Sequence, residues 1–188
     1  MIADLWTIAW KEWKEFLFSR GSLRGGLARQ MLLVFVFGVF LPLQVGRAWV
    51  ETPIVLAYWA WVPLLLVSGM VADSFAGERE RHTLETLLST RLPDRAILLG
   101  KVLAAVVYGW GTTTVSLVLG LVVVNVAQWQ GRLVLYPLLV ALAGPILSLL
   151  ISGLAATAGV LVSLRAATVR QAAQTMSIAT MVVFLGPA

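Results

Sequence analysis

The chemically most suggestive side chains of the sequence are Glu78, His82 and Glu85, which lie four and seven residues apart. On a helix this spacing places all three on one face, where carboxylate and imidazole groups can hold a metal ion. The chain has no other histidine and no cysteine, and no fourth ligand is evident nearby. A solvated face on which the charges pair with each other, Glu78 with His82 and Arg81 with Glu85, explains the same spacing. We therefore expect no metal site.

Motifs for enzymatic chemistry are absent from the sequence. It contains no G-x-x-x-x-G-K-[ST] loop for binding nucleotide phosphates, no nucleophile elbow and no H-E-x-x-H pair. The apolar stretches hold no Asp, Glu, Lys, Arg or His well inside them, and such residues are what proton or ion relays usually require. We expect neither an enzyme, nor a bound cofactor, nor a transporter driven by protons or sodium.

The composition indicates whether water or lipid surrounds the protein. Of the 188 residues, 60% are apolar and only 12% are charged, and the mean hydropathy is +0.91. Soluble domains carry about 25% charged residues, so lipid is the expected surroundings. An apolar content this high excludes intrinsic disorder, and the lack of cysteine excludes a disulfide-stapled secreted domain. The predicted fold class is all-α, a polytopic helical membrane protein.

The apolar runs predict an interfacial amino-terminal helix and about five membrane spans in a single transmembrane domain. Trp6, Trp10 and Trp13 recur at helical spacing in 1–19 with lysines beside them, as in a helix that lies in the headgroup layer and is anchored there by tryptophans. The alternative is an amphipathic helix packed on a soluble core. The expected membrane segments are 27–45, 54–72, 102–127, 133–164 and 175–188.

The fourth of these segments is too long for one straight crossing. We expect it to start at the interface and to be kinked or tilted near Pro145. Small residues recur along it at three- and four-residue spacings and predict close helix–helix packing: Ser148, Ser152, Ala155, Gly159 and Ser163. Polar residues at depth, such as Thr112, Thr113, Thr114, Ser116 and Asn125, are expected to join helices rather than to bind cargo.

Basic residues indicate the orientation. Twelve of the fourteen Lys and Arg residues lie before the first span, between the second and third, or after the fourth. The positive-inside rule places these parts and the amino terminus in the cytoplasm, with the chain multi-pass in the plasma (inner) membrane. The positive net charge is therefore an orientation signal, and no nucleic-acid-binding motif accompanies it.

The cytoplasmic segment 73–101 carries the most specific pattern. A helix is predicted over 78–89 with an apolar edge of leucines, followed by a break up to Pro93. Pro93 and Asp94 suit the first turn of a new helix that runs into the third span. A short amphipathic helix between two spans can press a mixed apolar and charged face into a groove of a soluble partner.

Residues 75–90, FAGERERHTLETLLST, and 92–101, LPDRAILLGK, resemble the signature of type-2 ABC exporter permeases. In that family an E-R-E-x-G-T-L-E-x-L-L pattern follows the second span, and a basic residue ends a helix entering the third. Glycine is common where this chain has His82. The resemblance extends to the amino-terminal helix and to the order of the spans.

The resemblance implies a membrane-spanning permease subunit that forms a translocation path with a second permease copy, as a homodimer or heterodimer. It also implies contact with two cytosolic ATPases, which would bind ATP and Mg²⁺, through the 78–89 helix and the amino-terminal helix. The residues implied in this coupling are Glu78, Arg79, Glu80, Arg81, Thr83, Leu84, Glu85, Leu87 and Leu88. Family members have six spans, so the carboxy-terminal part is expected to be missing.

Two other classes remain open from the sequence. A polytopic scaffold or assembly factor without cargo shares the spans and the topology, but it has no ATPase partner. A membrane-embedded enzyme needs clustered Asp, Glu or His near a membrane face, and only the 73–85 region comes close. The leading expectation is the permease of an ATP-driven exporter of a prokaryote.

Overall fold

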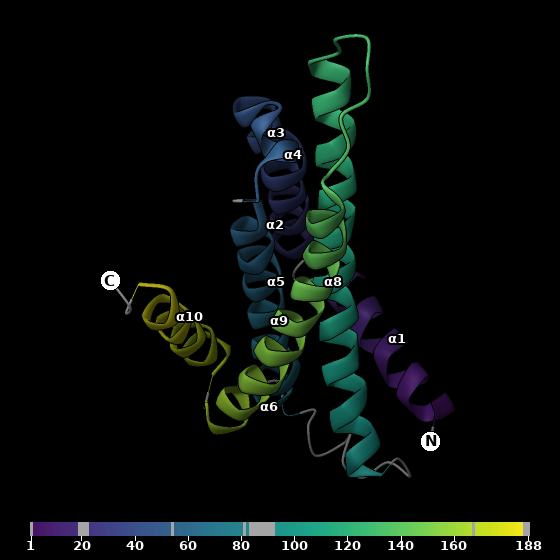
Figure 1. The fold of residues 1–188 in the computed structure, drawn as a ribbon. Helices are drawn as coiled ribbons and strands as arrows, with labels where there is room; N and C mark the ends of the chain where they lie inside the picture. Colours follow the sequence, from purple (N-terminus) through teal and green to yellow (C-terminus); the bar gives the residue numbers. More distant parts are fainter. Residues whose placement is uncertain are drawn as a thin grey trace.

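Long apolar helices account for the fold (Figure 1). The computed structural model describes residues 2–18, 23–53, 55–80, 82, 93–166 and 168–185, and within these ranges the regular elements are helices and no strand occurs. The elements are α1 (Ile2–Phe18), α2 (Leu23–Phe35), η1 (Val36–Phe40), α3 (Leu41–Val45), α4 (Ala48–Glu51), α5 (Val55–Ala72), η2 (Asp73–Gly77), α6 (Glu78–Glu80), α8 (Asp94–Ala127), α9 (Leu138–Arg165) and α10 (Val169–Leu185). The predicted all-α class is confirmed.

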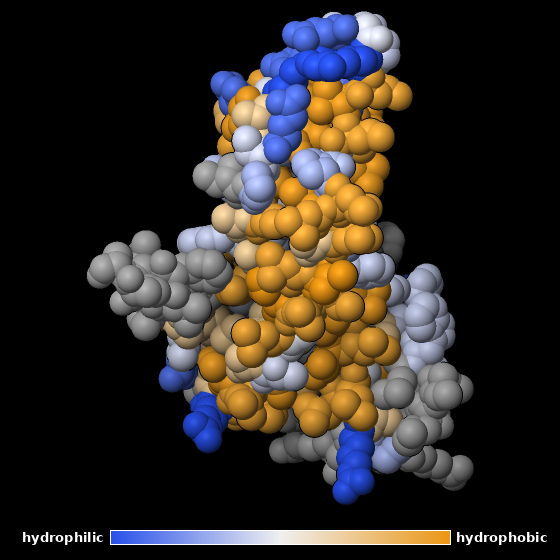
Figure 2. Space-filling model, viewed as in Figure 1, coloured by the Kyte–Doolittle hydropathy of each residue, from blue (hydrophilic) through white to orange (hydrophobic). Residues whose placement is uncertain are grey.

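Three described helical stretches are long and apolar enough to cross a membrane: Val55–Gly77, Arg95–Ala127 and Leu138–Arg165. A shorter apolar helix covers Gln30–Val45. Apolar side chains cover the middle of the surface in Figure 2, and hydrophilic residues gather towards its two ends. Leucines of α9 that are exposed in the isolated chain contribute to this apolar belt, for example Leu138, Leu142 and Leu154. A surface of this kind is stable against lipid and not against water, which confirms a polytopic membrane protein.

The ends of the helices follow the predicted grouping of charged segments. The end of α6, the start of α8 and the junction of α9 with α10 lie together at one end of the bundle, and α3 and α4 lie at the other (Figure 1). Pro93 is extended and precedes the first turn of α8, as its sequence predicted. At a rise of about 1.5 Å per residue, α8 is about 50 Å long, so it extends beyond the hydrocarbon layer.

The segment before α9 differs from the predicted span. Residues 128–137 are not helical, so α9 begins at Leu138 and not near residue 133. Asn125 explains the difference: its Nδ2 donates to the Val134 carbonyl, and its Oδ1 accepts from the Val134 amide, both at 2.8 Å. The Asn125 side chain thus satisfies the backbone amide and carbonyl of Val134, in a non-helical segment that returns along α8 (Figure 1). The last helix also begins earlier than expected, at Val169, six residues before the predicted apolar segment.

Packing of α5 against α9 depends on the small residues of α9. Ser148, Ser152, Ala155, Gly159 and Ser163 are all buried, as their spacing predicted. A Cβ placed on Gly159 would lie 3.0 Å from Val71 Cγ1 of α5, so glycine allows the close approach. Most buried hydroxyls nevertheless bond within their own helix, as Thr113 does to the Gly109 carbonyl and Ser116 to the Thr112 carbonyl. A carbonyl four residues back is always within reach of a helical Ser or Thr, so these residues permit packing without cross-linking the helices.

Ser163 instead bonds across to the π-helical turn η2. Its Oγ accepts from the Ala76 amide at 3.0 Å, and both residues are fully buried. The wider turn of a π-helix displaces backbone groups from the regular α-helical pattern. Ser163 therefore supplies a partner for an amide that η2 would otherwise leave buried without one.

Replacing Ser163 with alanine is expected to lower the free energy of unfolding by about 1–3 kcal/mol, the usual cost of a buried backbone amide without a partner. Thermal unfolding of the purified protein in detergent measures it. Ser177→Ala is the matched control, because the exposed Ser177 hydroxyl bonds only to the Ala173 carbonyl of its own helix. Equal melting temperatures for the two variants would contradict this role of Ser163.

Candidate functional site

Four charged side chains meet where α1, α6 and α8 come together. Lys11 and Glu12 are contributed by α1, Glu78 begins α6, and Lys101 lies in the second turn of α8. Ile8 and Ala9 of α1 are buried, and Glu12 follows them on the same helical face. The packed face of α1 thus carries an acidic residue towards the rest of the protein. We call these four residues the charged cluster.

Lys101 is the centre of the charged cluster. Its Nζ lies 2.8 Å from Glu12 Oε1 and 3.0 Å from Glu78 Oε1. The same ammonium donates to the Ser74 carbonyl of η2 at 2.8 Å, and it lies 5.0 Å from the centroid of the Phe75 ring. Lys11 completes the cluster with its Nζ 3.3 Å from Glu78 Oε1.

The charged cluster is neutral and largely buried. The Lys101 side chain is 1% exposed, and those of Glu12 and Glu78 are 7% and 8% exposed, whereas the Lys11 side chain remains 39% exposed. Burial raises the pKa of the Glu12 carboxyl above its ordinary value, and the neighbouring Lys101 ammonium opposes that rise. Two positive and two negative charges balance here, so each buried charge has an opposite one in contact.

Trp13 adds a second attachment of α1 to α8. Its Nε1 donates to the Ala104 carbonyl at 2.9 Å, one turn beyond Lys101. This carbonyl belongs to a helix interior and can accept a further bond. The charged cluster and Trp13 together join α1 to α8 through the buried ion pair of Glu12 with Lys101 and the hydrogen bond of Trp13.

The three tryptophans predicted as interface anchors differ in their exposure. Trp6 and Trp10 are exposed, 60% and 59%, as side chains in a headgroup layer must be. Trp13 is half-buried against α8, and its ring meets that of Trp6 edge-on with the centroids 6.2 Å apart. Membrane anchoring by Trp6 and Trp10 stays a prediction, and Trp13 has an additional role in packing.

The residues predicted to couple to an ATPase are only partly described. Glu78 is buried in the charged cluster, so its carboxylate faces the protein's own α1 and α8. Glu80 is exposed, and its Oε2 accepts from the Val169 amide at the start of α10 at 3.3 Å. Arg79 lies in α6. Outside the described residues lie Arg81, Thr83, Leu84, Glu85, Leu87 and Leu88.

The predicted continuous helix over 78–89 is wrong at His82. Helix α6 ends at Glu80, and His82 has φ of 57°, a left-handed conformation that an α-helix cannot contain. Glycine adopts this conformation without steric cost, which explains why glycine is common at this position in the family that the sequence resembles. Glu78 and His82 consequently do not share a helical face, and among the described residues no three His, Cys, Asp or Glu side chains group as metal ligands.

Glu12 and Ser74 were not singled out from the sequence, and Lys101 was noted only as one of the basic residues that indicate the orientation and through the resemblance. No signal in the sequence pointed to Glu12, because the apolar stripe of 1–19 is formed by the tryptophans and Glu12 lies away from it. Only the burial of Ile8 and Ala9 shows that Glu12 lies on a packed face. The Ser74 carbonyl gave no signal, since a π-helical turn exposes it and side-chain periodicity does not reveal such turns.

Comparison with known protein families matches residues 62–188 to the family described as ABC-2 family transporter protein. This range covers α6, α8, α9, α10 and most of α5. No curated protein and no solved structure matches the chain. The match spans more than half of the chain and includes the segment with the E-R-E pattern. The chain therefore belongs to the ABC-2 transporter family, and it is a membrane permease component of an ABC transporter.

Proposed function

We propose that this chain is the membrane-spanning permease subunit of an ATP-driven exporter, forms its path with a second permease copy, and receives the force of cytosolic ATPases through the segment after α6. The charged cluster is the observation that carries the proposal. Its ion pairs join α6, which follows α5 and η2, to the start of α8 and to α1. A displacement of the segment after α6 would thereby be transmitted to α5 and α8 together.

The ion pairs of the charged cluster make the connection between α1, α6 and α8 rigid. Separating Lys101 from Glu12 and Glu78 would leave charges buried without partners, which costs several kcal/mol. The three elements are therefore expected to move together when an ATPase closes on ATP. This is the behaviour that alternating access requires of a permease without ionisable residues inside its spans. ATP and Mg²⁺ would bind to the ATPase subunits, and the proposed coupling surface comprises the residues that follow Glu78.

Arg81 and Glu85 are the proposed contacts with the ATPase, because the Glu78 carboxylate is buried and paired with Lys11 and Lys101. We expect the double variant Arg81→Ala/Glu85→Ala to reduce co-purification with the partner ATPase at least tenfold. Stimulation of ATP hydrolysis by the reconstituted permease should fall in parallel. Loss of two charge-assisted contacts at a protein interface accounts for an effect of this size.

Arg132→Ala is the matched control, because Arg132 is exposed in the segment between α8 and α9, at the other end of α8 from the charged cluster. Both variants should retain the elution profile and melting temperature of the original protein. Undiminished capture of the ATPase by the Arg81→Ala/Glu85→Ala variant would overturn the proposed coupling surface. Failure of the unmodified protein to bind any ATPase would favour a scaffold without cargo.

A further inference from the structure

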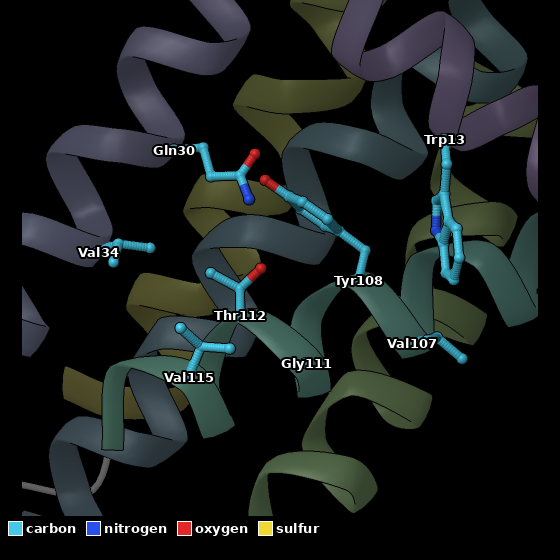
Figure 3. A pocket seen from close by; sticks show the side chains of 8 residues that line it. All are labelled: Trp13, Gln30, Val34, Val107, Tyr108, Gly111, Thr112 and Val115. Carbon is cyan, nitrogen blue, oxygen red and sulfur yellow. The ribbon is translucent and has the colours of Figure 1, made fainter. Parts of the chain in front are cut away.

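A cavity of about 280 Å³ lies between α1, α2 and α8 (Figure 3). Its walls come from one residue of α1, two of α2 and five of α8: Trp13, Gln30, Val34, Val107, Tyr108, Gly111, Thr112 and Val115. The exposed lining is mainly apolar, and the cavity is partly open at its side. It is separate from the charged cluster, which lies closer to the start of α8.

Gln30 is the polar feature of this cavity. Its side chain points towards the cavity from α2, opposite Tyr108 and Thr112 of α8 (Figure 3). The Gln30 Oε1 atom is buried and has no hydrogen-bond partner among the described residues. A buried amide oxygen without a donor costs free energy, so an occupant that donates a hydrogen bond here would be favoured.

On each of the two longer walls an apolar residue follows the polar ones with depth: Val34 follows Gln30 on α2, and Val115 follows Tyr108 and Thr112 on α8. Tyr108 follows Lys101 by seven residues and Val115 follows it by fourteen, which at about 1.5 Å per residue places them about 10 and 20 Å further along α8. A bilayer has about 30 Å of hydrocarbon inside a total of about 40–45 Å. If the charged cluster lies at the aqueous edge of the headgroup layer, Gln30 and Tyr108 are at the level of the headgroups, and Val34 and Val115 are deeper, among acyl chains.

The open side of the cavity continues into the apolar surface. Val115 is half exposed, and the neighbouring α2 residues Met31, Leu32 and Phe35 are exposed as well. Gly111 has no side chain to fill the cavity, and the space beside it is open, since a Cβ placed there would meet no atom within 4 Å. An alkyl chain can thus enter the cavity from the surrounding lipid without displacing a side chain.

We propose that this cavity is a binding site for one membrane phospholipid, whose acyl chain lies along Val34 and Val115 and whose headgroup donates a hydrogen bond to Gln30. The order of polar and apolar walls matches a glycerophospholipid of the leaflet that α1 covers. Ethanolamine headgroups supply an N–H donor, and choline headgroups supply none. The site therefore binds phosphatidylethanolamine in preference to phosphatidylcholine.

Native mass spectrometry of the delipidated protein in detergent, titrated with phosphatidylethanolamine or phosphatidylcholine, tests the site. The unmodified protein is expected to bind one phosphatidylethanolamine at least fivefold more tightly than phosphatidylcholine. Gln30→Leu should remove that preference, and Gly111→Leu should fill the cavity and abolish binding of both lipids. The control is Gly153→Leu in α9, where a Cβ also meets nothing within 4 Å, and it should bind as the original does.

Equal lipid binding by the Gly111→Leu and Gly153→Leu variants would overturn the proposal. A Gly111→Leu variant that instead changed the mass of the protein complex, with lipid binding intact, would assign the cavity to a second copy of the chain and also overturn it. Lipid binding is measured without an ATPase, so its failure is distinct from failure of the proposed transport function.

Discussion

Replacing Lys101 with methionine is expected to lower the free energy of unfolding by about 3–5 kcal/mol, the usual cost of removing one partner from a buried ion pair. The substitution leaves the Glu12 and Glu78 carboxylates together, 7% and 8% exposed, with only the half-exposed Lys11 to balance them. It also removes the hydrogen bond to the Ser74 carbonyl. Thermal or denaturant unfolding in detergent measures the loss. Lys14→Met is the matched control, because Lys14 is exposed on the same helix as Lys11.

Two further variants separate charge from packing. A triple variant, Lys101→Met with Glu12→Gln and Glu78→Gln, removes the unbalanced carboxylates and should recover most of the stability, because the penalty comes from charge without a partner. The deficit of Lys101→Met should also depend on pH. Burial already raises the pKa of Glu12, and loss of the Lys101 ammonium removes the opposing influence. A folded-state pKa above the unfolded value means that stability is retained at low pH and lost as the pH rises through the folded pKa.

The Lys101→Met variant should therefore be closer to the original protein at pH 5 than at pH 8. A deficit that is the same at both pH values, with no recovery in the triple variant, would show that Lys101 acts through its alkyl chain alone. In that case the charged cluster would not connect α1 to α8 electrostatically.

Most of the fold was predictable because its signals are local in the sequence. Apolar runs long enough to cross a bilayer predicted the three span helices, and Pro93 and Asp94 marked the start of α8. Small residues at three- and four-residue spacings predicted the buried face of α9. Each of these features depends on composition and periodicity within one segment, where lipid imposes a strict requirement on the chain.

The charged cluster was only partly predictable because its members are brought together by tertiary packing. Glu12 and Lys101 are 89 residues apart in the sequence, and no pattern within either segment specifies the other. Two errors have the same origin in backbone geometry. The left-handed His82 is incompatible with a continuous helix over 78–89, and the Asn125 side chain bonds to the Val134 backbone where apolar composition predicted a span from residue 133. Side-chain hydropathy does not report either feature.

Two glycines of α8 offer a test of how closely the spans pack. Gly109 is at the meeting of α8 with α5 and α9, where an added Cβ would lie 2.5 Å from Val67 Cγ2 and 2.9 Å from Ser152 Oγ. Gly111 is two residues further along the helix, and an added Cβ there meets nothing within 4 Å. The same substitution to alanine at both positions therefore changes packing at one and not at the other.

Gly109→Ala is expected to destabilise the protein by about 1–3 kcal/mol, because a methyl group must separate helices that are packed at interior density. Gly111→Ala is expected to raise the stability by up to about 1 kcal/mol, since alanine is the better helix former and no contact is disturbed. The difference in melting temperature between the two variants is the measurement, because both share one helix and one chemical change. Equal melting temperatures would mean that α5, α8 and α9 adjust freely to an added methyl group. Such helices could not transmit a displacement of the charged cluster across the membrane as a connected unit.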